Sequence, residues 1–261
     1  MQERRGFTFV EILVVMGIIA ILAALLLPVM NKVRQSTMQT RCLSNMRQLT
    51  AACLAYAMEN EGQLPYDNWG TPTDSSVYGH GWMFSGPQFR TGYPPNSDLN
   101  GSWSGQYAPV DGVMTGVLWP YLKNLGVYHC PLDTPEFWVD TEGMSSYLCN
   151  GAQSGYGAVG GGSNNLIPGA RLSRFTNNPN AVYFWEAQEQ LYQNQSLTGA
   201  VWNDGASYPT EEVLSARHFK GANVSCFDGH VEWWDPGTWQ FNASAGGPSR
   251  LWCSPYSSNG H

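Results

Sequence analysis

An apolar stretch of twenty-four residues, Phe7–Met30, contains one charged side chain, Glu11. In a helix that rises about 1.5 Å per residue, twenty apolar residues cover the roughly 30 Å hydrocarbon core of a bilayer. Arg4 and Arg5 precede the stretch, and the positive-inside rule places that end on the cytoplasmic side. We therefore expect a single-pass helix in the cytoplasmic (inner) membrane, with the N-terminus in the cytoplasm and the C-terminal domain in the periplasm or outside the cell.

A secretory signal peptide, removed after export, is the alternative interpretation of this stretch. The apolar run is longer than the usual apolar region of about 7–15 residues, and no small-x-small cleavage site follows it. Instead, apolar residues continue at helical spacings of four and three, at Cys42, Met46, Leu49, Cys53 and Tyr56. We expect one helix over 7–60, about 80 Å long, ended by Gly62 and Pro65.

Charge divides the chain into the same two regions. Residues 1–60 hold six Lys/Arg and three Asp/Glu, whereas residues 61–261 hold seven and seventeen. The net charge of −7 argues against a nucleic-acid partner, which would need a basic surface. A basic head and an acidic body, large enough at 261 residues to bury a core, indicate regions in different surroundings.

The start of the apolar stretch has a specific pattern. Residues 4–15, R-R-G-F-T-F-V-E-I-L-V-V, resemble the class III leader of type IV pilins and type II secretion pseudopilins. The resemblance implies that a prepilin peptidase/methyltransferase cuts between Gly6 and Phe7 and N-methylates Phe7. The expected divisions are then a leader peptide (1–6), a transmembrane and assembly helix (7–30), an amphipathic continuation (31–60) and an exported globular pilin-like domain (61–261).

The same resemblance implies that Glu11 is the assembly glutamate and that Pro28 lies where pilin helices commonly carry a proline. A carboxylate in hydrocarbon costs several kcal/mol unless it is protonated or paired. Cleavage after Gly6 creates an ammonium group one helical turn from Glu11, on the same chain or on a neighbouring subunit. The alternative is a glutamate near the interface that snorkels or stays neutral. Pro28 is expected to kink or locally melt the helix.

The body, residues 61–261, contains all eleven tryptophans and reads as long loops with short strands. We predict a strand at 145–150 and a short helix or turn at 113–122. Asp228-Gly229 predicts a two-residue type I′ hairpin turn that pairs Cys226 with Val231 and Val224 with Trp233. The predicted fold class is α+β, with the long N-terminal helix packed on a small antiparallel sheet, as in pilins.

A second pattern lies at 218–234. His218 is followed after nine residues by Asp228 and Gly229, and Cys130 opens a Cys-Pro-x-Asp sequence. Together these resemble the H-X9-DG region of prepilin-like proteins that are abundant in planctomycetes and their relatives. The resemblance implies no ligand.

Metal-ligating residue types occur in this region, namely His218, Cys226, Asp228 and His230. Cys226 and His230 lack a zinc-finger spacing and face opposite sides in the predicted register, while Asp228 is explained by the turn. We therefore predict no metal site there, and a hydrogen-bonded, structural His218 that fixes the loop before the hairpin.

The acidic loop at 133–142 is a weak calcium candidate, because major pseudopilins resemble one another in carrying a calcium site in a loop. Its carboxylates are Asp133, Glu136, Asp140 and Glu142. A solvated acidic loop is the preferred interpretation, so no cofactor is expected.

Six cysteines in an exported domain are expected to pair rather than to catalyse. Cys42 and Cys53 lie about 16 Å apart along one helix, too far for a bond between them. The sequence selects none of the fifteen connectivities, and we hypothesise a Cys130–Cys149 disulfide.

Enzymatic motifs are absent from the sequence: it has no nucleophile elbow, no zinc-protease motif and no phosphate-binding loop. We therefore predict that the chain is not an enzyme. Trp69, Trp82, Trp103 and Tyr107 lie in polar, loop-like sequence, where aromatic rings either stack on sugars or pin loops to the body.

The sequence thus predicts a structural subunit of a type IV pilus-like or type II secretion pseudopilus filament. It would polymerise with other pilin or pseudopilin subunits through its N-terminal helix. The alternative is a membrane-anchored surface adhesin or polysaccharide-binding module that uses the helix as its anchor.

Overall fold

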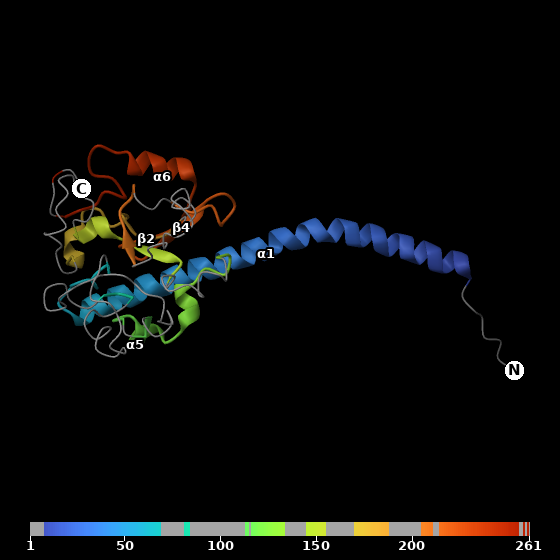
Figure 1. Cartoon of the computed structure of the whole chain (residues 1–261), viewed down its shortest axis with the longest axis horizontal. Coiled ribbons are helices and arrows are strands. Elements are labelled where there is room, and N and C mark those ends of the chain that lie inside the picture. The colour runs from blue at the N-terminus through green and yellow to red at the C-terminus, as the bar shows by residue number, and fades with distance from the viewer. Residues whose placement is uncertain are drawn as a thin grey trace, which may run out of the picture.

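The computed structural model describes residues 8–68, 81–83, 113–114, 116–133, 145–154, 170–187, 205–210, 214–255, 258 and 260. One helix, α1 (Phe9–Glu59), is 51 residues long, and its N-terminal half projects away from the body (Figure 1). The prediction of a single continuous helix is confirmed.

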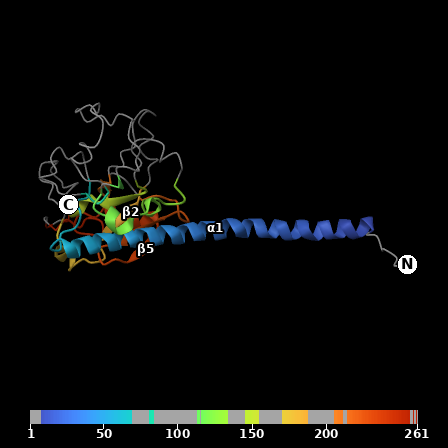
Figure 2. The same ribbon diagram turned by 90° about the horizontal axis from the view of Figure 1, so that it is seen from below.

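Burial divides α1 at Cys42. Before it the side chains are exposed or half-buried, and after it one face of the helix lies against the body (Figure 2). The buried residues follow the predicted stripe, with Tyr56 only half-buried: Cys42, Met46, Leu49, Thr50, Ala52, Cys53 and Ala57. The helix ends where the Gly62 N–H donates to the Ala57 carbonyl, with Gly62 at φ +81°.

The sheet has five strands in the order β3-β1-β2-β4-β5. Their bounds are β1 Tyr147–Asn150, β2 Val182–Glu186, β3 Ala206–Ser207, β4 Ala222–Cys226 and β5 Val231–Trp234. The pairs β1–β2, β2–β4 and β4–β5 are antiparallel, as predicted, whereas β3 runs parallel to β1 and makes the sheet mixed. The strand predicted at 145–150 is β1.

Helices cover both faces of this sheet. On one face α1 packs over a core that includes Tyr183 and Phe184 of β2. On the other face lies α6 (Pro236–Ala243), whose Trp239 packs with Trp185 and Val224 (Figure 1). A register shift between Val182 and Phe184 marks a bulge in β2, so the strand sends adjacent aromatic residues to the α1 face.

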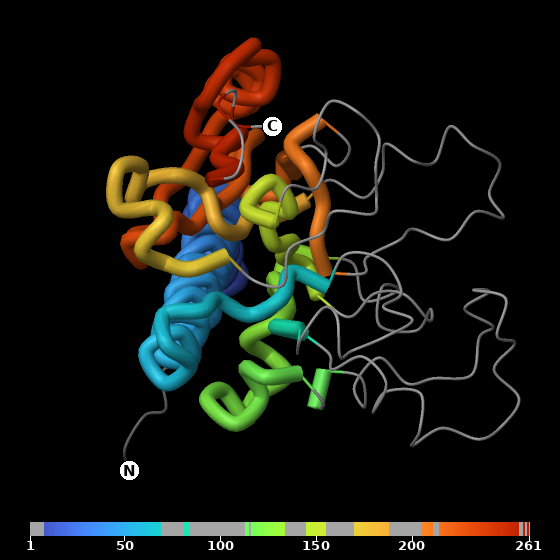
Figure 3. The backbone as a smooth tube through the Cα atoms, turned by 90° about the vertical axis from the view of Figure 1, so that its left-hand side faces the viewer, coloured from blue at the N-terminus to red at the C-terminus, as the bar shows by residue number. Residues whose placement is uncertain are grey.

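Short helices complete the α1 face. The predicted helix or turn at 113–122 ends in α5 (Trp119–Leu122), which is followed by the 3-10 turn η1 (Leu125–Tyr128). Figure 3, viewed along α1, shows this green segment beside the helix. Two further 3-10 turns, η3 (Gly151–Ser154) and η5 (Leu172–Phe175), follow β1 and precede β2.

The β4–β5 hairpin differs from its predicted register by one residue. Ser225 pairs with Val231 and Val224 with Glu232. The Cys226 N–H donates to the His230 carbonyl and the Gly229 N–H, at φ +90°, to the Cys226 carbonyl. The loop therefore has three residues, a turn closed by a left-handed glycine, rather than a two-residue type I′ turn.

Because side chains alternate across a strand, this shift reverses the faces of β5. Trp234 is buried against α6 and Trp233 is 41% exposed, whereas the predicted register buried Trp233.

Candidate functional site

The projecting half of α1 is covered with exposed apolar side chains. Its large hydrophobic residues from Phe9 to Val33 are 51–79% exposed. Among the described residues, α1 is the one helix long and apolar enough to cross a membrane. Such a surface is stable in lipid or against other helices, but not in water.

The first turn of this helix holds Glu11 in a capping box with Thr8. The Thr8 N–H and hydroxyl both donate to Glu11 Oε2, at 2.7 and 2.8 Å, and the Glu11 N–H donates to Thr8 Oγ1 at 3.3 Å. The carboxylate is therefore folded back toward the N-terminal end of the helix. Gly6 and Phe7 lie outside the described residues.

Pro28 lies inside α1, where it removes one backbone donor. The helix nevertheless continues through it, and Figure 1 shows the projecting half as a smooth arch. A kink or a locally melted turn is expected at Pro28, and the structure contains no melted turn there.

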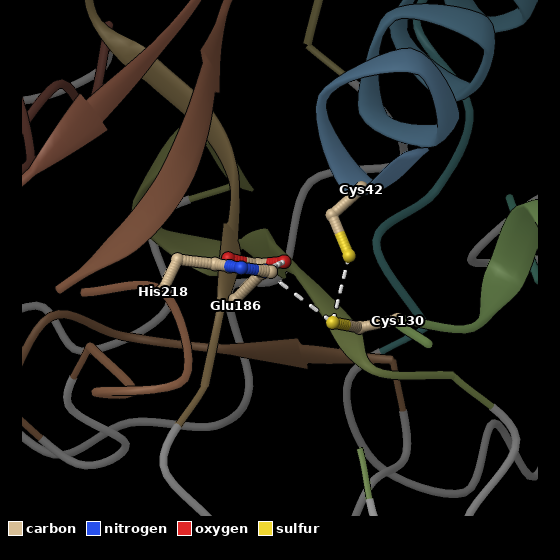
Figure 4. A group of neighbouring side chains, drawn as sticks. All are labelled: Cys42, Cys130, Glu186 and His218. Atoms are coloured by element: carbon tan, nitrogen blue, oxygen red, sulfur yellow. Dashed lines mark hydrogen bonds and ion pairs between the residues drawn. The ribbon is translucent and has the colours of Figure 1, made fainter. Parts of the chain in front are cut away.

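A second group of functional side chains is buried where α1 meets the sheet (Figure 4). It consists of Cys42 from α1, Cys130 after η1, Glu186 at the end of β2 and His218 before β4. Their ligand atoms all lie within 4.8 Å of one another, and all four residues are buried. The Sγ atoms of Cys42 and Cys130 are 2.7 Å apart, and His218 Nε2 lies 3.4 Å from Cys130 Sγ and 3.0 Å from Glu186 Oε1.

Electrostatics within this group favour a charged histidine. Burial lowers the pKa of His218, but its hydrogen bonds to Cys130 and Glu186 outweigh burial and raise the pKa to about 9. The contact with Cys42 and the bond to His218 lower the pKa of Cys130 to about 7, while that contact and burial raise the pKa of Cys42. Cys42 is accordingly the donor in the contact between the two sulfurs.

A tight turn positions His218. The His218 and Gly221 backbones exchange two hydrogen bonds, and Phe219 and Lys220 between them have φ of 51° and 68°. Bulky residues seldom adopt this left-handed conformation, so surrounding contacts must hold it. One such contact is the bond from Trp233 Nε1 to the His218 carbonyl, at 2.7 Å.

The hypothesis of a Cys130–Cys149 disulfide differs from the structure. Both residues are buried free thiols. The sulfur near Cys130 is that of Cys42, whereas Cys149 Sγ accepts a hydrogen bond from Gln153 Nε2 at 2.9 Å. Cys149 lies on β1, and the thiol in contact with Cys130 is instead that of Cys42 on α1.

Two comparisons with known proteins concern the N-terminal part of the chain. Residues 1–27 match the family described as the prokaryotic N-terminal methylation motif. The chain is also 36% identical over 64 residues to the ComG operon protein 3 homolog of Bacillus licheniformis. That alignment covers 24% of this chain and 66% of the relative, slightly less than two thirds of its length. No solved structure matches the chain.

The chain is a pilin-like protein with a prepilin methylation motif. The motif implies processing by a prepilin peptidase, and the apolar α1 is consistent with membrane anchoring before assembly. Pilin-family proteins are structural and non-enzymatic, in agreement with the prediction that this pilin-like chain is not an enzyme.

Trp82 is the one described residue among the four aromatic residues that were candidates for stacking on sugars, and its environment is the protein core. Trp82 is fully buried, and its Nε1 donates to the carbonyls of Asp67 and Gly205 at 3.1 and 2.9 Å. It pins loops to the core. Trp69, Trp103 and Tyr107 lie outside the described residues.

Asp133 is the one calcium candidate among the described residues, and its carboxylate already has an ion-pair partner. It is buried and forms an ion pair of 2.9 Å with Arg217. Glu136, Asp140 and Glu142 lie outside the described part of the chain.

The hairpin residues weighed for metal binding lie closer together than predicted, because of the register shift. Ligand atoms of Cys226, His230 and Glu232 gather within 4.8 Å. His230 is bonded to Asp228, and Arg250 contacts both Glu232 and the Cys226 sulfur. The guanidinium thus already pairs with the carboxylate of this partly exposed group.

Sequence reasoning missed the group around His218. In the sequence Cys42 is one member of an apolar stripe, and Glu186 belongs to no recognisable motif. A signal existed in the run V-Y-F-W-E, where a carboxylate ends an apolar strand.

Proposed function

We propose that this protein is a structural subunit of a type IV pilus-like or type II secretion pseudopilus filament, assembled through α1. The observation that carries the proposal is the exposed apolar half of α1, most of which lies within the methylation motif matched over residues 1–27. Copies of such a helix bury one another's apolar surfaces when they stack. The globular domain, residues 61–261, then lies on the outside of the filament.

Processing precedes assembly in this proposal. A prepilin peptidase/methyltransferase removes residues 1–6 between Gly6 and Phe7 and methylates Phe7. Until then residues 7–30 hold the chain in the cytoplasmic membrane, with the N-terminus in the cytoplasm and the domain exported. Residues 31–60 continue the helix into the body.

Glu11 has the central role in subunit contact. Its carboxylate lies at the start of the helix, bonded to Thr8, next to the position where the new amine of Phe7 would form. Pairing with the amine of an adjacent subunit would remove an isolated charge from lipid. Other pilin or pseudopilin subunits are therefore the expected partners.

The C-terminal region supports a finer assignment within the prepilin-like proteins. His218 is buried in the core, and Asp228 and Gly229 shape the hairpin loop, so each residue of the H-X9-DG pattern has a structural position. The assignment to the group abundant in planctomycetes rests on this pattern.

Three variants test the charge-pairing account. Glu11→Ala and Glu11→Gln remove the charge and are expected to insert and be cleaved normally but to enter sheared filaments at least about tenfold less. Thr8→Val, the matched control, removes the capping hydroxyl but keeps the charge, and should assemble nearly normally. Normal filament yield from Glu11→Gln would refute charge pairing. An equally low filament yield from Thr8→Val would mean that the loss of helix capping, not of charge, reduces assembly.

A further inference from the structure

We propose that Cys42, Cys130, Glu186 and His218 bind a divalent transition-metal ion, best matched by zinc, in a structural site that ties α1 to the body. The proposal does not depend on filament assembly, because the site lies within one chain (Figure 4). Thiolate, imidazole and carboxylate are the ligands of protein zinc sites, and four protein ligands with no open position define a structural site.

The positions of the four ligand atoms are close to those around one ion. With zinc bonds of about 2.0–2.3 Å, tetrahedral geometry places ligand atoms about 3.3–3.8 Å apart. His218 Nε2 lies 3.4 Å from Cys130 Sγ and 3.0 Å from Glu186 Oε1. The two sulfurs, 2.7 Å apart, would separate by about 1 Å as the ion enters between them.

Hydrogen bonding alone accounts poorly for this convergence. His218 Nε2 carries at most one proton, yet both a sulfur and a carboxylate oxygen lie within bonding distance of that nitrogen. The sulfur of Cys42 lies 2.7 Å from the sulfur of Cys130, so a further possible ligand atom is part of the group. An ion at the centre would satisfy all four atoms at once.

Surrounding contacts orient the ligands, as second-layer hydrogen bonds do in metal sites. The Asn223 N–H donates to Glu186 Oε2 at 2.7 Å, which leaves Oε1 directed into the group. The buried Tyr147 hydroxyl accepts a hydrogen bond from Asn45 Nδ2 at 3.4 Å and acts to lower the pKa of the Cys42 thiol. The Arg217–Asp133 ion pair joins the loop that carries His218 to the loop that carries Cys130.

Charge and burial also favour a bound metal ion in this group. In the metal-free group Cys42 is a hydrogen-bond donor and His218 pairs with Glu186. Metal binding releases these protons, and the two thiolates and one carboxylate then carry three negative charges, which a divalent ion reduces to one. Unpaired charges in a dry interior cost several kcal/mol each, and a coordinated cation removes that cost. The other group with suitable ligands, around Cys226, is partly exposed and already contacts Arg250, so it needs no ion.

The location gives the ion a mechanical role. Cys42 is the first buried residue of α1, and the apolar side chains from Phe9 to Val33 before it are exposed. Force on the projecting half would begin to separate helix from sheet at this point. A metal bond from Cys42 to three other segments would close that end of the interface.

The test begins with the full chain, purified in detergent micelles without reductant or chelator. Elemental analysis is expected to find about one zinc ion per chain, and alkylation followed by mass spectrometry should find Cys42 and Cys130 unlinked. Replacement of zinc by cobalt(II) should give sulfur-to-cobalt charge-transfer bands and intense tetrahedral ligand-field bands.

Matched variants identify the ligands. Cys42→Ser and Glu186→Gln should lower the bound metal to less than about one tenth of an ion per chain, whereas Cys53→Ser, at another buried thiol of α1, should retain it. If the ligand variants fail to fold, the wild-type chain still decides: chelation should lower its melting temperature and zinc should restore it. A Cys42–Cys130 disulfide without metal, or unchanged metal content in Cys42→Ser, would overturn the proposal.

Discussion

At the scale of residues, polar atoms in the core hold distant loops together. Trp82 stacks on Tyr128 with ring centroids 6.0 Å apart and meets Phe184 edge to face at 5.0 Å. Its indole N–H is shared by the carbonyls of Asp67 and Gly205. The ring thus fills the α1 face of the sheet while its one donor satisfies backbone groups from two other segments.

Trp82→Phe tests this role. Phenylalanine keeps an aromatic ring but removes the indole N–H that donates to the buried Asp67 and Gly205 carbonyls, so the free energy of unfolding should fall by about 1–3 kcal/mol. Urea denaturation of the full chain in micelles measures the change. Phe241→Ala, at a ring that is 80% exposed, is the control and should change stability by less than about 0.5 kcal/mol. An equal loss in both variants would count against the pinning role of Trp82.

Metal affinity should depend on pH in a defined direction. Binding must displace the proton of Cys42, that of Cys130 below a pKa of about 7, and that of His218 below a pKa of about 9. The logarithm of the association constant should therefore fall by up to about three per pH unit below pH 7 and by less above it. Competition with a coloured chelator at pH 6, 7 and 8 measures this slope. Affinity that is independent of pH would exclude thiolate ligands.

At the scale of elements, the sequence predicts some structures well and others poorly for physical reasons. The spacing of Cys42, Met46 and Leu49 identifies the buried face of α1 because one side of that helix meets solvent. β2 has no such alternation: all five of its residues are buried between two helical layers. Asp228-Gly229 predicts a hairpin, but the pair fits both two-residue and three-residue loops, so the register could not be fixed.

Gly229→Ala tests the three-residue loop. At φ +90° an alanine is strained although only Leu54 approaches its Cβ, at 3.5 Å, so the free energy of unfolding should fall by roughly 1–2 kcal/mol. Gly246→Ala, which has open space and no positive φ, should leave the midpoint of urea unfolding nearly unchanged. If the two variants behave alike, the left-handed closure of the loop is wrong.

Leu49→Ala tests the docking of α1 on the sheet. Leu49 is fully buried, and its truncation should cost about 2–5 kcal/mol because a cavity remains between helix and sheet. Gln48→Ala, on the exposed face one residue earlier, is the control. Limited proteolysis of the body should accelerate only in Leu49→Ala, and equal rates would mean that this face does not hold the body.

At the scale of the whole molecule, α1 belongs to two environments. Its first half presents apolar side chains outward, and its second half forms one wall of the core. The first half was predictable because a contiguous motif encodes it. The group of Cys42, Cys130, Glu186 and His218 was not, because only the fold brings four distant segments together.

We propose that the chain is a prepilin whose apolar helix becomes free to assemble once residues 1–6 are removed. Intact-mass and N-terminal analysis of the mature protein from its native membrane tests this claim most directly. We expect a polypeptide that begins at Phe7 and carries one methyl group on its amine. A polypeptide that begins at Met1, or that has lost the whole of residues 7–30, would contradict it.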